Sequence, residues 1–121
     1  VTRGDEYCRD RKISLIDLLK IDVEGAEYAV LEGFRDMLAA NAVRCIQFEY
    51  GYNNGDVHVL MKDFYSLLSR YGYVIGKLWS RGVSFSDFEH KLNNFRTGPN
   101  FVAVRGGDSD LRQLLDRRLP T

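Results

Sequence analysis

Residues 15–27 read LIDLLKIDVEGAE, and this stretch decides the fold. Its first seven residues form a compact apolar run that ends at Asp22, a profile typical of a buried parallel strand. Gly25 then stands where the backbone must turn sharply, a conformation that glycine adopts at no steric cost. The stretch therefore predicts a strand over about residues 15–22, followed at once by a helix.

The helix after this turn is predicted to have one buried face. Glu27, Glu32 and Arg35 would lie outside, because the apolar residues fall at helical spacing on the other face. These apolar residues are Ala26, Val30, Phe34, Met37 and Leu38. Asn41 closes the helix, and a β-rich run over residues 43–50 follows. The chain thus begins with a strand–helix–strand unit.

A second unit repeats this logic. Residues 51–56 have the composition of a loop, and Asp56 is a suitable N-cap for the helix that follows. The apolar face of that helix runs to Tyr71. Residues 73–79 then form the third predicted strand.

The C-terminal third departs from this alternation. Residues 81–98 are predicted to form a long excursion, with a short helix near residues 86–92. A last strand follows near residues 101–105, and a helix from residue 109 to about 119 closes the chain.

Together these elements predict an α/β fold with a mixed sheet. The first three strands, which the two strand–helix units connect, are expected to be parallel, and the strand near residues 101–105 antiparallel. The first strand, residues 15–22, would lie at an unpaired edge of the sheet. Because such an edge invites pairing with another chain, we expect a homo-oligomer formed through it.

Composition narrows the function classes. The 121 residues allow one domain at most, and 17 Lys and Arg against 17 Asp and Glu give no net charge. Without a basic stripe, nucleic acid is not an expected partner. No apolar run approaches the ~20 residues that span a bilayer, so no membrane partner is expected. Cys8 and Cys45 are expected to be free thiols in a cytoplasmic protein.

Three carboxylates are predicted to meet at one edge of the sheet. Asp22 and Glu24 follow the first strand, and Glu49 ends the second, which a right-handed crossover places beside it. Ligands of open α/β sheets bind beyond these strand ends. The alternative is that Asp22, Glu24 and Glu27 only cap the helix and stay solvated. Oxygen ligands suit Mg²⁺, but no His or further acid completes a cage, so no metal is expected.

Other side chains near this edge have two interpretations each. Tyr50 and Tyr52 could line an acceptor pocket, although core packing explains most aromatic residues. His58 is predicted in the first turn of the second helix, where it could serve as a general base or be an ordinary surface residue.

A longer stretch of sequence similarity favours a functional site over simple helix capping. The stretch KIDVEGAEYAVLEG, residues 20–33, resembles the central motif of the FkbM-type methyltransferase family. The segment around Gly4-Asp5-Glu6-Tyr7-Cys8 is similar to its lead-in. Further similar segments follow in the family's order and extend the resemblance over roughly residues 2–105; they are Cys45 to Tyr50, Tyr71-Gly72-Tyr73 and Asn100 to Ala103.

The resemblance implies a class I methyltransferase, or Rossmann-like, fold whose seven-stranded sheet has an antiparallel last strand. On that mapping the chain begins just before the fourth strand. Residues 1–121 would be a single partial domain without the N-terminal half that carries the Gly-rich turn and the ribose-binding acid. The first residue, Val1 rather than Met, agrees with that expectation.

The resemblance also implies an activity, namely methylation by S-adenosylmethionine of a hydroxyl on a small-molecule or glycan acceptor such as a sugar or secondary metabolite. Asp22 is the first candidate for catalysis and Glu49 the second. The cofactor would contact Asp22 and Glu24, and the acceptor would contact Glu24, Tyr50, Tyr52 and His58. The alternatives are a non-catalytic remnant or interaction module, and a different α/β enzyme that shares only the Asp-x-Glu-Gly turn.

Overall fold

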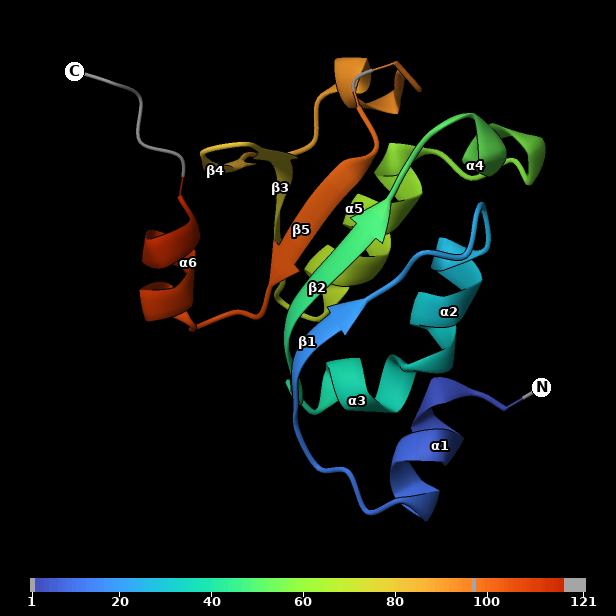
Figure 1. The fold of residues 1–121 in the computed structure, drawn as a ribbon, viewed down its shortest axis with the longest axis vertical. Coiled ribbons are helices and arrows are strands. Elements are labelled where there is room, and N and C mark those ends of the chain that lie inside the picture. Colours follow the sequence, from blue (N-terminus) through green and yellow to red (C-terminus); the bar gives the residue numbers. More distant parts are fainter. Residues whose placement is uncertain (1, 97, 117–121) are drawn as a thin grey trace.

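The computed structural model describes residues 2–96 and 98–116 as an α/β fold around a five-stranded sheet (Figure 1). The strands lie in the order β1-β2-β5-β3-β4. Their bounds are Ile16–Lys20 for β1, Val43–Glu49 for β2, Val74–Trp79 for β3, Gly82–Phe85 for β4 and Asn100–Val104 for β5.

The sheet is mixed, as the sequence predicts. β1 pairs in parallel with β2, whereas β5 pairs antiparallel with both β2 and β3. β1, β2 and β3 therefore run in one direction, and the last strand is inserted between β2 and β3. Because β1 has one neighbour only, its outer edge is open among the described residues.

The helices surround this sheet. They are α1 (Gly4–Asp10), α2 (Glu27–Gly33), α3 (Arg35–Ala39), α4 (Tyr52–Asp56), α5 (Met61–Arg70), the 3₁₀ helix η1 (His90–Asn93) and α6 (Ser109–Leu115). The single helix predicted after Gly25 is divided into α2 and α3 at Phe34. The last residues of the predicted C-terminal helix, 117–119, lie outside the described residues.

Two local predictions between β2 and α5 were wrong. Residues 52–56 form the short helix α4 rather than a loop, and Asp56 ends this helix instead of capping the next one. α5 begins at Met61, and the Asp63 carboxylate accepts a hydrogen bond from the Leu60 amide at 2.8 Å. An acid in the first turn therefore stabilises the start of α5, as capping chemistry favours.

The excursion after β3 was also predicted incorrectly in part. Gly82–Phe85 form β4, which pairs antiparallel with β3 through the tight turn at Ser80 and Arg81. The short helix expected near residues 86–92 is replaced by chain without regular secondary structure and by the 3₁₀ helix His90–Asn93.

Two apolar clusters hold the sheet between helices. The larger cluster packs β2 and β5 against α2, α3 and α5, with Leu31, Phe48 and Phe64 fully buried. The smaller cluster lies under α6 and includes Val83, Val102 and Val104. Figure 1 shows α6 on one side of the sheet and α2 and α3 on the other.

Both cysteines are buried and free, as expected. Among the described residues, none of the helices has both the length and the apolar character needed to cross a membrane.

Candidate functional site

The carboxyl ends of β1 and β2 lie side by side, because the two strands are parallel neighbours. The loop after β1 and the segment after β2 enclose a cavity of about 150 Å³. Its lining consists of Glu24, Gly25, Glu27, Glu49, Tyr50, Gly51, Tyr52, Asn53, Asn54 and Pro99. This is the sheet edge at which the sequence predicts a site.

The turn after β1 is built by two residues with positive φ. Glu24 has φ 50° and Gly25 has φ 108°, and together they redirect the chain into α2. A Cβ atom on Gly25 would lie 2.9 Å from the backbone oxygen of Asn53. Glycine is therefore required here for its φ angle and because the two loops touch.

Glu27 lies in a different place from the one predicted. It is 1% exposed, although the helical spacing put it on the outer face. Its Oε2 accepts hydrogen bonds from the Gly25 amide at 2.8 Å and from Asn54 Nδ2 at 3.2 Å. Glu27 is thus a buried link between the loops and neither a solvated helix-capping residue nor an outer-face residue.

Glu49, the last residue of β2, lines the cavity and is half-buried. Burial raises the pKa of the Glu49 carboxyl above its ordinary value, and the nearby charges of Asp22 and Glu27 raise it further. Lys20 acts in the opposite direction and only partly offsets these effects. A carboxylate whose pKa is raised toward neutrality is better matched to proton transfer than a fully solvated one.

The two tyrosines after Glu49 differ in environment. Tyr50 is 1% exposed, donates from its hydroxyl to the Asn93 carbonyl at 2.8 Å and packs among the core phenylalanines. Tyr52 is 62% exposed, and its hydroxyl accepts a hydrogen bond from Arg96 Nε at 2.9 Å. Both line the cavity, Tyr50 as part of the core and Tyr52 as its outer wall.

Asp22 and His58 do not line the cavity. Asp22 is exposed just beyond β1, yet close enough to influence the pKa of Glu49. His58 is exposed in the turn between α4 and α5 with φ 59°, so its predicted place in the first turn of a helix was wrong. The structure therefore brings together Glu24, Glu49, Tyr50 and Tyr52.

Sequence reasoning missed several residues of this cavity. Asn54 is 2% exposed and accepts a hydrogen bond from the Gly51 amide at 2.9 Å through Oδ1. Pro99 closes one wall, and its carbonyl accepts a hydrogen bond from the Tyr50 amide at 2.7 Å. An isolated Asn or Pro does not indicate a binding site in a sequence, because each contributes here only through its place in the folded chain. Within residues 2–96 and 98–116, no group of three or more His, Cys, Asp or Glu is arranged to hold a metal ion.

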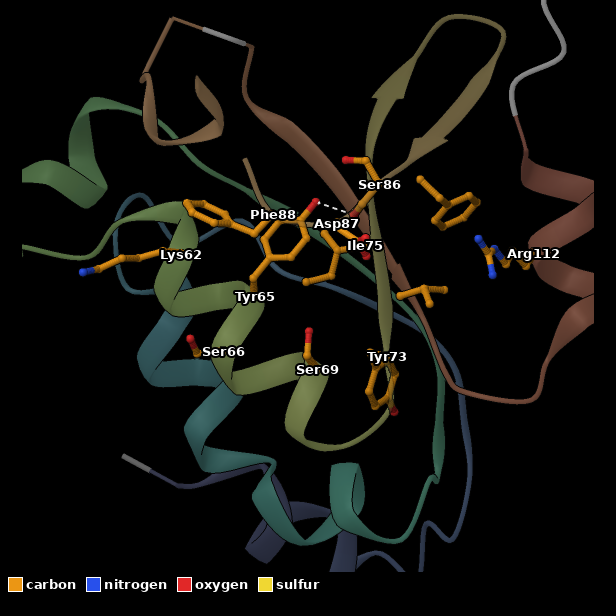
Figure 2. Close-up of a pocket in the computed structure, with 12 residues that line it drawn as sticks. Lys62, Tyr65, Ser66, Ser69, Tyr73, Ile75, Ser86, Asp87, Phe88 and Arg112 are labelled. Carbon is orange, nitrogen blue, oxygen red and sulfur yellow. Dashed lines mark hydrogen bonds between the residues drawn. The ribbon is translucent and has the colours of Figure 1, made fainter. Parts of the chain in front are cut away.

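A second, larger cavity of about 570 Å³ lies between α5 and the β3–β4 hairpin (Figure 2). There the Tyr65 hydroxyl donates to the Ser86 carbonyl at 3.1 Å. Val74 and Ile75, at the start of β3, line this cavity, so it lies at the opposite ends of the strands from Glu49. None of the acidic, tyrosine or histidine candidates named from the sequence lines it.

Comparison with known families supports the resemblance on which the sequence argument rests. The model described as "Methyltransferase FkbM domain" matches residues 1–75. This range contains β1, β2 and every lining residue of the smaller cavity except Pro99. Neither a curated protein nor a solved structure matches the chain.

Proposed function

This chain belongs to the FkbM methyltransferase domain family, and from that premise we propose that the cavity beyond β1 and β2 is the acceptor side of an S-adenosylmethionine-dependent O-methyltransferase. The proposed acceptor is a hydroxyl of a sugar or secondary metabolite. In this proposal, the described strands form the C-terminal half of a class I methyltransferase, Rossmann-like, sheet. The inserted antiparallel strand β5 supports that assignment.

The observation that carries the proposal is the environment of Glu49. Methyl transfer to an alcohol needs alignment of the oxygen with the methyl group, and it needs a base that takes the hydroxyl proton. Glu49 is a carboxylate with a raised pKa, held by a strand end inside a small cavity. We assign to it the role of accepting the proton at its carboxylate oxygen.

The remaining residues are assigned to binding. Glu24 and the exposed ring of Tyr52 would contact the acceptor at the mouth of the cavity, and Tyr50 would form its floor. Asp22, exposed beside the cavity, would orient the hydroxyl or the methionine part of the cofactor. His58 would contact only an acceptor that extends beyond the cavity, because it lies outside the lining.

S-adenosylmethionine fits these residues in part. Its sulfonium and ammonium groups are cationic, and the charged side chains that line the cavity are all carboxylates, namely Glu24, Glu27 and Glu49. Once bound, the cofactor supplies an electrophilic methyl group. No Gly-rich strand–turn–helix for its adenosine part precedes Asp22 in these 121 residues. We therefore expect residues 1–121 alone to bind the cofactor weakly or not at all.

A non-catalytic interaction module is the second candidate function. The open edge of β1 favours it, since Leu18 in this strand and Leu15 just before it are 58% and 50% exposed. An edge with exposed apolar side chains is suited to pairing with another strand.

An assay of methyl transfer distinguishes these two candidate functions. The native polypeptide that carries residues 1–121 would be incubated with methyl-labelled S-adenosylmethionine and a panel of polyhydroxylated acceptors. The catalytic proposal expects label in a methyl ether, identified by mass spectrometry. A folded protein that binds the cofactor but labels only nitrogen or carbon atoms would refute O-methylation. A folded protein that does not bind it would favour the interaction module.

A further inference from the structure

We propose that Glu27 is a positioning residue of this site, whose buried carboxylate ties the loop after β1 to the segment after β2. This inference rests on the proposed function for its catalytic consequence. Its structural part rests on the hydrogen bonds alone, and the two parts can therefore be tested separately.

The link is continuous from one loop to the other. The Gly25 amide donates to Glu27 Oε2 at 2.8 Å, and Asn54 Nδ2 donates to the same oxygen at 3.2 Å. Asn54 in turn accepts a hydrogen bond from the Gly51 amide at 2.9 Å through Oδ1. One carboxylate–amide pair thus joins backbone amides on both loops.

The link is also buried. Glu27 is 1% exposed and Asn54 is 2% exposed, so water cannot readily replace either partner. No ion pair among the described residues involves Glu27. A buried carboxylate without a cation is costly unless donors satisfy it, and the two amide donors serve that purpose. An apolar side chain would leave both donors without an acceptor.

The consequence for the site is geometric. Glu24 and Gly25 reach the cavity from one loop, whereas Tyr52 and Asn53 reach it from the other. The link fixes the distance between these two walls and keeps a negative charge beside Glu49. Glu27 acts through its neighbours, because both of its hydrogen-bonded partners belong to the protein.

Two substitutions of Glu27 separate the link from its charge. In Glu27→Gln, the amide oxygen can take the place of Oε2 and accept from both Gly25 and Asn54, so the link is kept while the charge is removed. Glu27→Met has a similar length but offers neither donor an acceptor, so it breaks the link and removes the charge. Glu32→Gln, on the same helix but in a partly exposed ion pair with Arg35, is the matched control.

The first measurements need no substrate. In Glu27→Met we expect faster hydrogen exchange at the Gly25 amide, which loses its acceptor, and at the Gly51 amide, because Asn54 is no longer held; Glu27→Gln should keep both amides protected. The Tyr50 amide, which donates to Pro99 at 2.7 Å, should exchange unchanged and serves as the internal control. The pKa of Glu49, followed by carboxyl ¹³C NMR, should fall in both variants, because each removes the charge of Glu27. If Glu27→Met does not fold, Asn54→Ala breaks the link from α4 and should speed exchange at the Gly25 amide.

Turnover of the native polypeptide tests the catalytic consequence. Misplacement by about 1 Å can cost on the order of 10²-fold in rate, so we expect kcat to fall by up to that factor in Glu27→Met and by much less in Glu27→Gln. If Glu27→Met keeps wild-type kcat and wild-type protection of Gly25 and Gly51, the role of Glu27 is refuted while the methyltransferase proposal stands. If the wild type transfers no methyl group, the proposed function fails, and the exchange and pKa measurements still decide whether the link exists.

Discussion

Arg44 Nε lies 2.7 Å from Asp108 Oδ2 and so ties the start of β2 to the residue that precedes α6. The same carboxylate accepts from Arg105 Nε at 3.2 Å and from the Leu111 amide at 3.3 Å. Its side chain is only 8% exposed. One carboxylate therefore joins β2, the end of β5 and the first turn of α6, and it orients α6 over the smaller apolar cluster.

Substitution of Asp108 by Asn should destabilise the fold in a pH-dependent way. Hydrogen bonds from Arg44, the Leu111 amide and Arg105 lower the pKa of Asp108 from 3.8 to about 2, and the one from Arg44 has the largest effect. Because the folded-state pKa is depressed, the stabilisation is present above pH 3.8 and is lost as the pH falls toward 2. Asn keeps the acceptor for the Leu111 amide but removes the ion pairs.

Urea unfolding of wild type and Asp108→Asn between pH 2 and 7 measures this difference. The two free energies of unfolding should differ at neutral pH and converge at the acid end. Asp110→Asn, an exposed acid in the same helix, is the control. A stability difference that stays constant over the whole range would contradict the assigned role of the ion pairs.

Asp5 makes a comparable connection between α1 and α3. Its Oδ2 accepts from the Asp36 amide at 2.8 Å and its Oδ1 from the Met37 amide at 3.0 Å. It is 6% exposed, and no side chain adjacent to α3 in sequence caps this helix. Because loss of an N-cap costs about 0.5–2 kcal/mol, we expect Asp5→Ala to lower the free energy of unfolding by that amount.

Chemical denaturation can check this value against Glu6→Ala, which removes an exposed acid from the same helix and should change stability by less than ~0.5 kcal/mol. Equal effects of the two substitutions would mean that the hydrogen bonds of Asp5 contribute no net stability.

The strand–helix alternation was predictable because it depends on local patterns. The apolar run that ends at Asp22 and the β-rich run that ends at Glu49 both form parallel strands. The position of β5 between β2 and β3 and its antiparallel direction both depend on pairing across the sheet, because a long excursion is also compatible with a parallel crossover.

The β4 hairpin was missed because its turn lacks the usual chemistry. Ser80 and Arg81 form the two-residue connection, whereas Asn-Gly or Asp-Gly would have indicated a hairpin. The alternation of Val83 and Phe85 with smaller residues was the available signal, and it was too short to identify a strand on its own.

The sequence predicts at which edge of the sheet the site lies, but not which residues are in contact there. Parallel strands place Glu24 and Glu49 at the same edge whatever the details of the loops. The burial of Glu27 depends on Asn54, which lies 27 residues further along the chain. Helical periodicity cannot report such a contact, and for that reason it placed Glu27 on the outer face.

The open edge of β1 should make the chain self-associate. Leu18 in this strand and Leu15 just before it are 58% and 50% exposed, and the outer edge of the strand has no partner among the described residues. We expect sedimentation velocity to show a dimer or larger species whose population grows with concentration. Leu18→Lys should shift the distribution toward monomer, because a charge on an edge strand opposes pairing. A wild-type monomer at the highest concentration accessible would show that this edge is not an association surface.

Replacement of Glu49 should damage methyl transfer more than replacement of Asp22, the reverse of the order expected from the sequence. Glu49 lines the cavity, whereas Asp22 is exposed outside it. A general base contributes roughly 10²–10⁴-fold, so Glu49→Gln should lower kcat of the native polypeptide by a factor in that range, with its melting temperature little changed.

The pH dependence of turnover then distinguishes a base from a binding group. Glu49 must be ionised to accept a proton, so wild-type kcat should fall as the pH decreases through its raised pKa. Glu49→Gln should lose this acid limb. Asp22→Asn should keep the limb but move it to lower pH, because the charge of Asp22 is one cause of the raised pKa of Glu49. If Asp22→Asn instead abolishes the limb while Glu49→Gln preserves it, the base is Asp22, and the cavity residue has only a binding role.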